Sequence, residues 1–308
     1  MINGLINTDD SYQIDKAREI ELLTTYNYLI EKKVILERPV VEKKWMDNIY
    51  NRFLLHQMAD TQGRFSEPLA IDFETFSFEN CNIDVCISSK NLETLFQFVY
   101  HPDYDNSGGL KVGFRSEEDK SKFLNNLFDA LRIIKEVDID AFQMIKSTLK
   151  CVCPIYLLTP LKRGDVISFT CDYAVGLIMY SSCPAILTAE TIIHETRHNV
   201  LNSYLKINQY VKDNKVTVKT PLREDLRPLL GLLHQAYVLS GLVKFYKALL
   251  SVEQYHDMEN VKKRYNVHLS DFMDSIRILE ENKFYLTPIG LKLVDKFAKE
   301  SIFYGQIS

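Results

Sequence analysis

The segment that most constrains this chain is AETIIHETRHNVLNSYLKI, which begins at Ala189. Its apolar residues recur at helical spacing, which predicts an amphipathic helix that Thr188 would cap. Ile192, Ile193, Val200 and Leu201 flank an HExxH motif, His194-Glu195-Thr196-Arg197-His198, and indicate that this helix is buried. His194 and His198 stand four residues apart, so both imidazoles project from one helix face and can converge on one metal ion. The motif therefore predicts a metal centre built on a buried helix.

The composition of the 308-residue chain is that of an ordinary globular protein, with 46% hydrophobic and 25% charged residues. These proportions exclude a disordered tail, a coiled coil and a collagen-like fibre. The 37 Lys and Arg residues against 41 Asp and Glu residues give a net charge of −4. Such a balance gives no electrostatic footprint for a phosphate backbone, so we expect no nucleic-acid partner. Small molecules or peptides are the more plausible partners for a chain with this charge balance.

The six cysteines are expected to be reduced core thiols rather than disulfides, because the N-terminus shows no signal peptide. They are Cys81, Cys86, Cys151, Cys153, Cys171 and Cys183. No stretch approaches the roughly 18 apolar residues of a membrane span. We therefore expect a cytoplasmic protein that does not enter a membrane. Nothing in the sequence indicates its oligomeric state.

The absence of repeats and Pro/Gly-rich linkers predicts a single domain over residues 1–308, of a mostly helical α+β class. Residues 1–149 are expected to form a helical N-terminal part and a possible peptide-binding region, with helices at 9–33 and 116–137. Residues 150–308 would hold the metal site. Short runs rich in β-branched and aromatic residues, VCPIYLLT, DVISFT and YAVGLIMYSS, predict two or three strands of a small sheet ahead of the HExxH helix.

Three further helices are expected after the HExxH helix. An apolar segment from Pro228 to about Leu250 predicts the first, with Pro228 in its opening turn and Arg227 at the N-cap. SDFMDSIRILEEN predicts the second. LTPIGLKLVDKFAKE predicts the last, opened by Thr287 and Pro288.

His234 is the leading candidate for a third metal ligand, because it stands in the middle of the apolar helix LLGLLHQAYVLSGL. A histidine there needs a partner; the alternative is a core histidine satisfied by a hydrogen bond. Arg227 lies seven residues earlier, on almost the same face, and can pair with a carboxylate of a metal-bound molecule. The alternative for Arg227 is a solvated residue near the helix cap. Tyr237, one turn after His234, can hydrogen-bond near the metal or simply be part of the core.

Two protease classes that use HExxH are disfavoured. Metzincins carry Gly and His where this chain has Leu201 and Tyr204. A Glu-x-x-x-Asp pattern typical of gluzincins occurs at Glu253, but in a polar segment expected to be an exposed turn. The charged Arg197 between Glu195 and His198 also departs from zinc-protease helices. Glu224, in the charged stretch REDLR, stays open with Glu195 and Glu253 as a carboxylate ligand.

Three blocks of this chain resemble a bacterial family, the HExxH-motif peptide-modification proteins encoded beside ribosomally made peptide natural products. The blocks are HETRHNVLNSYL, PLREDLRPLLGLLHQAYVLSGLVKFY and LTPIGLKLVDKF, and DVISFTCDYAVGLIMYSS is similar to the family's strand segment before the HExxH helix. The resemblance covers roughly residues 150–300. HExxH combined with Arg-Pro-x-x-Gly-x-x-His is far more specific than HExxH alone.

The resemblance implies a non-haem Fe(II) and 2-oxoglutarate-dependent oxygenase that uses O2 to hydroxylate a β-carbon in a precursor peptide. By this resemblance His194 and His198 match the iron-binding pair, His234 the downstream histidine and Arg227 the arginine of the Arg-Pro block. The distal carboxylate of 2-oxoglutarate needs a cation, for which Arg227, Arg223 and Arg197 are candidates. Glu195 and Tyr237 are the candidate catalytic residues.

Two other functions stay open. One is a zinc peptidase, in which Glu195 is the general base that activates a metal-bound water. The other is a non-catalytic peptide-binding protein that keeps the HExxH helix for structural reasons.

Overall fold

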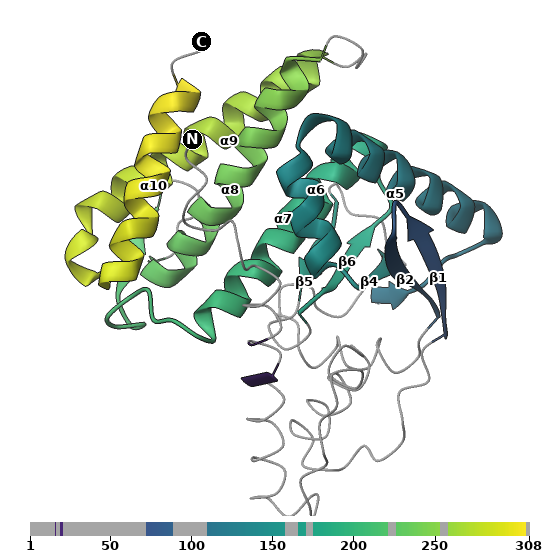
Figure 1. Ribbon diagram of the computed structural model, residues 1–308, viewed down its shortest axis with the longest axis horizontal. Coiled ribbons are helices and arrows are strands. Elements are labelled where there is room, and N and C mark those ends of the chain that lie inside the picture. Colours follow the sequence, from purple (N-terminus) through teal and green to yellow (C-terminus); the bar gives the residue numbers. More distant parts are fainter. Residues whose placement is uncertain are drawn as a thin grey trace, which may run out of the picture.

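A computed structural model of the chain describes residues 16, 19–20, 72–88, 110–157, 166–170, 175–220, 226–252 and 258–305. In this part the protein is an α+β fold in which six α-helices accompany a mixed sheet (Figure 1). None of the described helices is long and apolar enough to cross a membrane. The helix expected at 9–33 lies outside the described residues, apart from Lys16, Glu19 and Ile20, which are helical.

The first described elements form a β-hairpin, where the sequence analysis expected helix. Strands β1 (Asp72–Phe78) and β2 (Cys81–Ser88) pair antiparallel. Glu79 and Asn80 join them with positive φ angles of 49° and 62°, as a tight two-residue turn of the type I′ class requires. The expectation of helix was therefore wrong for residues 72–88. Cys81, Ile83 and Val85 alternate into the core, and this period of two is the strand signal that was overlooked.

The hairpin joins a six-stranded sheet. The other strands are β3 (Leu110–Val112), β4 (Cys151–Leu157), β5 (Ser168–Thr170) and β6 (Leu177–Ser181). The strand order is β1-β2-β4-β6-β5, with β3 also paired to β4. Strand β4 runs parallel to β2 and β6, and its first five residues are buried, as the apolar run predicted. Two or three strands were expected between 152 and 182, and the structure has three there, β4, β5 and β6.

Two helices cover one face of this sheet. Helix α5 (Glu117–Val137) begins after Ser116, whose side chain accepts a hydrogen bond from the Asp119 amide, so the helix expected at 116–137 is confirmed. Helix α6 (Ile139–Thr148) follows at once, with Asp138 as its N-cap. The aromatic ring of Phe123 stacks on Tyr180 of β6, with ring centroids 4.8 Å apart.

The HExxH segment is helix α7 (Ala185–Leu205), and it begins earlier than expected. The N-cap is Pro184, not Thr188. The Thr188 hydroxyl donates instead to the Cys183 carbonyl at 2.9 Å, so this residue ties the first turn to the loop before it. Twelve of the helix's residues are buried, as its flanking isoleucines and valine indicated.

A short hairpin precedes the next helix and changes the expected position of Arg227. Strand β7 (Thr217–Lys219) pairs antiparallel with β8 (Leu226–Pro228), so Arg227 is a strand residue opposite Val218. Helix α8 (Leu229–Leu250) has Pro228 as its N-cap, which places the helix start one residue later than predicted. Helix α8 is mostly apolar, and 14 of its 22 residues are buried.

The C-terminal helices pack beyond α8. They are α9 (Met258–Glu281), the short 3-10 helix η2 (Lys283–Tyr285) and α10 (Pro288–Gly305). The Thr287 hydroxyl accepts a hydrogen bond from the Gly290 amide, which confirms the predicted start of the last helix. Helix α7 lies between the sheet side of the molecule and α8, which in turn contacts α9 and α10 (Figure 1).

The cysteines that the structure describes are reduced thiols. Cys81, Cys86, Cys151, Cys153 and Cys183 are all buried and none forms a disulfide, as expected. Cys171 lies outside the described residues.

Candidate functional site: a histidine cluster between α7 and α8

Glu195, between the two histidines of α7, and Asn199, which follows the second, attach this helix to the sheet. Ser168 of β5 donates its hydroxyl hydrogen to Glu195 Oε1 at 2.7 Å. The Asn199 side chain accepts from the Gly176 amide at 3.0 Å and donates to the Leu177 carbonyl at 3.1 Å. Gly176 has a φ of 99°, a conformation that favours glycine, and it leads into β6. Glu195 and Asn199 therefore hold α7 in register with the sheet.

Arg197 attaches α7 to α8, on the side of α7 that faces away from the sheet. Its Nε donates to the Tyr237 carbonyl at 2.7 Å and its Nη2 donates to Ser240 Oγ at 2.7 Å. Its guanidinium carbon also lies 4.2 Å from the centroid of the Tyr237 ring. The structure thus places this candidate cosubstrate-binding arginine in the seam between the two helices.

The two histidines of α7, His194 and His198, lie beside His234 of α8. Nε2 of His198 is 3.2 Å from Nε2 of His194, and Nδ1 of His198 is 3.4 Å from Nδ1 of His234. The His198 and His234 rings stack with centroids 5.6 Å apart. The three histidines singled out from the sequence therefore form one cluster.

The spacing of the α7 pair suits a shared metal ion. Two imidazole nitrogens that each lie about 2.1 Å from one ion are separated by roughly 3.0–3.4 Å for right-angle to tetrahedral geometry. His198, however, turns Nε2 to His194 and Nδ1 to His234, and these atoms lie on different edges of one ring. Among the described residues, accordingly, no group of three or more His, Cys, Asp or Glu side chains has the arrangement of a formed metal site.

Partial burial lowers the pKa of all three imidazoles, so they are neutral near pH 7. It lowers the pKa of His194 to about 4 and that of His234 to about 4, where the positive charge of Arg227 adds to the effect. The pKa of His198 is lowered well below its usual value by burial and then by the two neighbouring imidazoles. A neutral imidazole has a lone pair free for a metal ion, so the electrostatics of the cluster suit ligation.

Glu195 is buried at the edge of this cluster. Its Oε1 lies 3.9 Å from Nε2 of His194. Burial raises the pKa of Glu195 to about 7, against the opposing hydrogen bond from Ser168. A carboxyl group that titrates near neutrality can take up or release a proton there.

Arg227 lies beside the first turn of α8. Its Nη1 donates to Gln235 Oε1, and its side chain lies along Gly231, where a Cβ would stand 3.2 Å from Arg227 Nε. Its charge lowers the pKa values of both His234 and His198, as expected of a guanidinium close to the cluster. Arg223, Glu224 and Glu253, the other candidates for cosubstrate or metal binding, lie outside the described residues.

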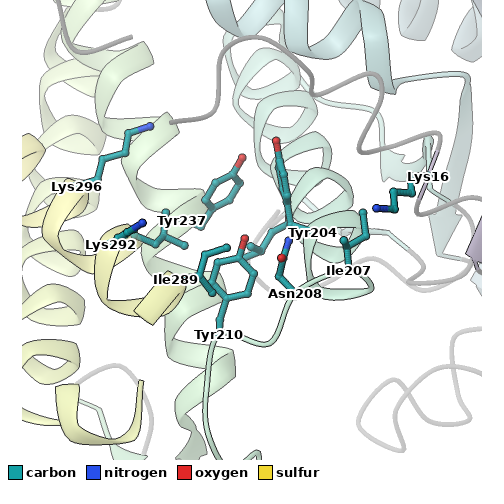
Figure 2. Close-up of a pocket in the computed structure, with 11 residues that line it drawn as sticks. Lys16, Tyr204, Ile207, Asn208, Tyr210, Tyr237, Ile289, Lys292 and Lys296 are labelled. Atoms are coloured by element: carbon teal, nitrogen blue, oxygen red, sulfur yellow. The ribbon is translucent and has the colours of Figure 1, made fainter. Parts of the chain in front are cut away.

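Tyr237 lines a cavity of about 360 Å³, together with residues of α7, of α10 and of the segment that follows α7 (Figure 2). Its hydroxyl points in the same general direction as that of Tyr204 in this view. The ring is buried and lies against Arg197 and, at a centroid distance of 6.4 Å, against Phe297.

The sequence analysis overlooked a charged network one turn before His194. Glu190 Oε2 accepts hydrogen bonds from Arg264 Nη1 at 2.6 Å and from the Tyr246 hydroxyl, while Nε2 of His268 lies 3.3 Å from its Oε1. The available signal was the position of Glu190, four residues before His194 and so on the same face of the helix. Its partners come from α8 and α9, and no local pattern indicated them.

The chain matches no protein-family model, and a search of curated proteins gives no significant match.

Proposed function

We propose that this protein is a non-haem Fe(II) and 2-oxoglutarate-dependent oxygenase that hydroxylates a side-chain β-carbon in a ribosomally synthesised precursor peptide. The observation that carries the proposal is the 3.2 Å separation of the His194 and His198 Nε2 atoms, with His234 stacked on His198. The family resemblance of the HExxH and Arg-Pro-x-x-Gly-x-x-His blocks supplies the identity of the metal and the reaction.

His194 and His198 would supply two neutral nitrogens to such an ion from one helix face. His234 faces the other ring nitrogen of His198, so its use as a third ligand would require one of these two rings to turn. Fe(II) with 2-oxoglutarate and O2 supplies the oxidising power that inserts one oxygen atom into a C–H bond, while 2-oxoglutarate becomes succinate and CO2.

The chain's own residues position the reactants and hold protons. Arg227 would pair with a carboxylate of the cosubstrate. Its charge lowers the pKa values of His234 and His198, as expected of a cation close to the proposed metal site. Glu195, with its raised pKa, would hold or release a proton beside His194. The apolar surface of α8 would restrict water around the cluster.

The experiment that tests this proposal needs no knowledge of the peptide. Metal-free protein is supplied with Fe(II), 2-oxoglutarate and O2, and succinate is measured. We expect slow formation of succinate by the wild type and loss of this activity in His198→Ala. The matched control is His268→Gln, which removes a histidine outside the cluster and should retain the activity. Equal succinate formation by wild type and His198→Ala would contradict the proposal.

A second candidate is a zinc peptidase, favoured by Glu195 alone. Its carboxylate lies 3.9 Å from a histidine of the motif and its pKa of about 7 suits a general base. In that function Glu195→Gln abolishes turnover of peptides, whereas in the oxygenase it leaves partial formation of succinate. Peptide cleavage by the zinc-loaded wild type that is lost in Glu195→Gln would establish the peptidase.

A further inference from the structure

The cavity that Tyr237 lines combines tyrosine hydroxyls with lysine ammonium groups. Tyr204 and Tyr237 come from α7 and α8, and Tyr210 from the segment after α7. Lys292 and Lys296 come from successive turns of α10, and Lys16 lies on the opposite side of the cavity (Figure 2). These six residues are named here the tyrosine–lysine pocket. Its volume of about 360 Å³ lies in the range of roughly 300–1,000 Å³ of ligand sites.

The described residues that line the tyrosine–lysine pocket carry positive charge, although the chain as a whole carries −4. No Asp or Glu is among the described residues that line it. Lys296 Nζ lies 3.8 Å from Oε1 of Glu300, one turn further along α10, so its charge is offset in part by an ion pair. Several positive charges around one cavity favour an anionic ligand.

The hydroxyl groups of the pocket are hydrogen-bond donors for such an anion. Tyr210 is buried, and burial together with the neighbouring Tyr237 raises its pKa to about 12, so its hydroxyl keeps its proton at neutral pH. In Figure 2 the Tyr210 hydroxyl points into the space between Tyr237 and Tyr204. A carboxylate accepts hydrogen bonds from both hydroxyl and ammonium groups, which makes it a matching ligand.

The rest of the lining is apolar. Leu201, Ile207, Ile289 and Leu293 form it, with the Asn208 side chain beside them. An inorganic ion such as free phosphate would leave this apolar surface exposed to water. A ligand that carries its carboxylate on an apolar or aromatic body would cover the apolar surface as well.

We propose that the tyrosine–lysine pocket binds a carboxylate carried on an apolar or aromatic body. Leu201 follows His198 by three residues and Tyr237 follows His234 by three, so the pocket begins about one helical turn beyond the histidine cluster on both helices. The carboxylate can belong to a free small acid or to an acidic side chain flanked by apolar residues in a peptide. The binding needs no metal ion and does not depend on the proposed oxygenase activity.

The test is a calorimetric titration of the metal-free full chain with two matched pairs of probes. One pair is 4-phenylbutyrate and its neutral amide, and the other is the blocked dipeptide Phe-Glu and its counterpart Phe-Gln. The variants are the double substitution Lys292→Gln/Lys296→Gln and, separately, Tyr210→Phe. Lys299→Gln is the control, because Lys299 is an exposed lysine of the same helix that does not line the pocket.

We expect at least one acid to bind more tightly than its neutral counterpart, and the double variant to bind it about tenfold more weakly. Tyr210→Phe should weaken binding less, and Lys299→Gln should leave it unchanged. Binding of phenylbutyrate alone assigns the pocket to small acids, and binding of Phe-Glu alone assigns it to a peptide side chain.

Three results would overturn the proposal: no binding of either acid at millimolar concentration, equal binding of acids and neutral counterparts, or equal weakening by Lys299→Gln and the double variant. Thermal unfolding of each variant checks that the fold is retained. Because the titration uses metal-free protein, these results leave the metal-dependent activity to its own test.

Discussion

Arg197 of α7 lies so close to Gly241 of α8 that a Cβ on this glycine would stand 2.3 Å from Arg197 Cδ and 2.5 Å from Arg197 Nε. The same arginine donates hydrogen bonds to the Tyr237 carbonyl and to Ser240. The close approach of the two helices that carry the histidines therefore depends on a glycine at this one position.

Gly241→Ala should destabilise the protein by about 1–3 kcal/mol, because the added methyl group displaces a hydrogen-bonded guanidinium. Urea unfolding at neutral pH measures this change. The control is Gly305→Ala, where a Cβ would meet nothing within 4 Å. Combining Gly241→Ala with Arg197→Ala should cost less than the sum of the two single changes, and strict additivity would show that the contact is not the cause.

Lys244 on α8 secures α6 through two aspartates. Its Nζ lies 2.8 Å from the buried Asp138 and 2.9 Å from the exposed Asp140, and Asp138 also caps α6. Burial alone would lower the pKa of Lys244, but the two carboxylates raise it above its usual value. Lys244→Gln should cost about 1 kcal/mol of stability, since the lysine is itself 41% exposed and the ion pair is partly screened. In thermal unfolding Asp140→Asn should have a smaller effect, and an equal loss would show that Asp138 is not the important partner.

Glu190 should make the protein sensitive to acid. Burial would raise the pKa of its carboxyl group, but His268, Tyr246 and Arg264 together lower it below 4.5. The unfolded chain therefore binds this proton more readily, so the contribution of Glu190 to stability is complete above about pH 4.5 and is lost as the pH falls below it.

Urea midpoints measured from pH 3 to 7 test this dependence. Glu190→Gln should be less stable than the wild type at pH 7 but lose less stability on acidification. Glu281→Gln removes an exposed partner of Arg277 and should keep the acid dependence of the wild type. The same dependence in Glu190→Gln as in the wild type would assign the acid sensitivity to other carboxylates.

The sequence predicted those parts of the fold whose signals are local. Ser116 caps α5 by its own side chain, and the β-branched runs around β4 and β6 are buried strands. It failed where a competing tertiary contact decides the outcome. Thr188 is a good capping residue, yet its hydroxyl donates to the Cys183 carbonyl, and the helix begins at Ala185.

In the candidate site, too, local sequence signals predicted some features, while tertiary contacts decided the others. The i, i+4 spacing predicted that His194 and His198 share a face, and the apolar surroundings of His234 singled it out as a residue that needs a partner. Which ring nitrogen faces which neighbour depends on side-chain rotation and could not be predicted from spacing. The contact of Arg197 with Ser240 and that of Glu190 with Arg264 join residues more than forty and seventy positions apart, which no local pattern encodes.

The most direct measurement of the central claim is an anaerobic titration of metal-free protein with Fe(II) and then 2-oxoglutarate, followed by visible absorption. The account predicts the charge-transfer band of a chelated 2-oxo acid at one iron per chain, and its loss in His198→Ala. No band at saturating Fe(II) and 2-oxoglutarate, with tight stoichiometric binding of zinc instead, would contradict the oxygenase and favour the peptidase.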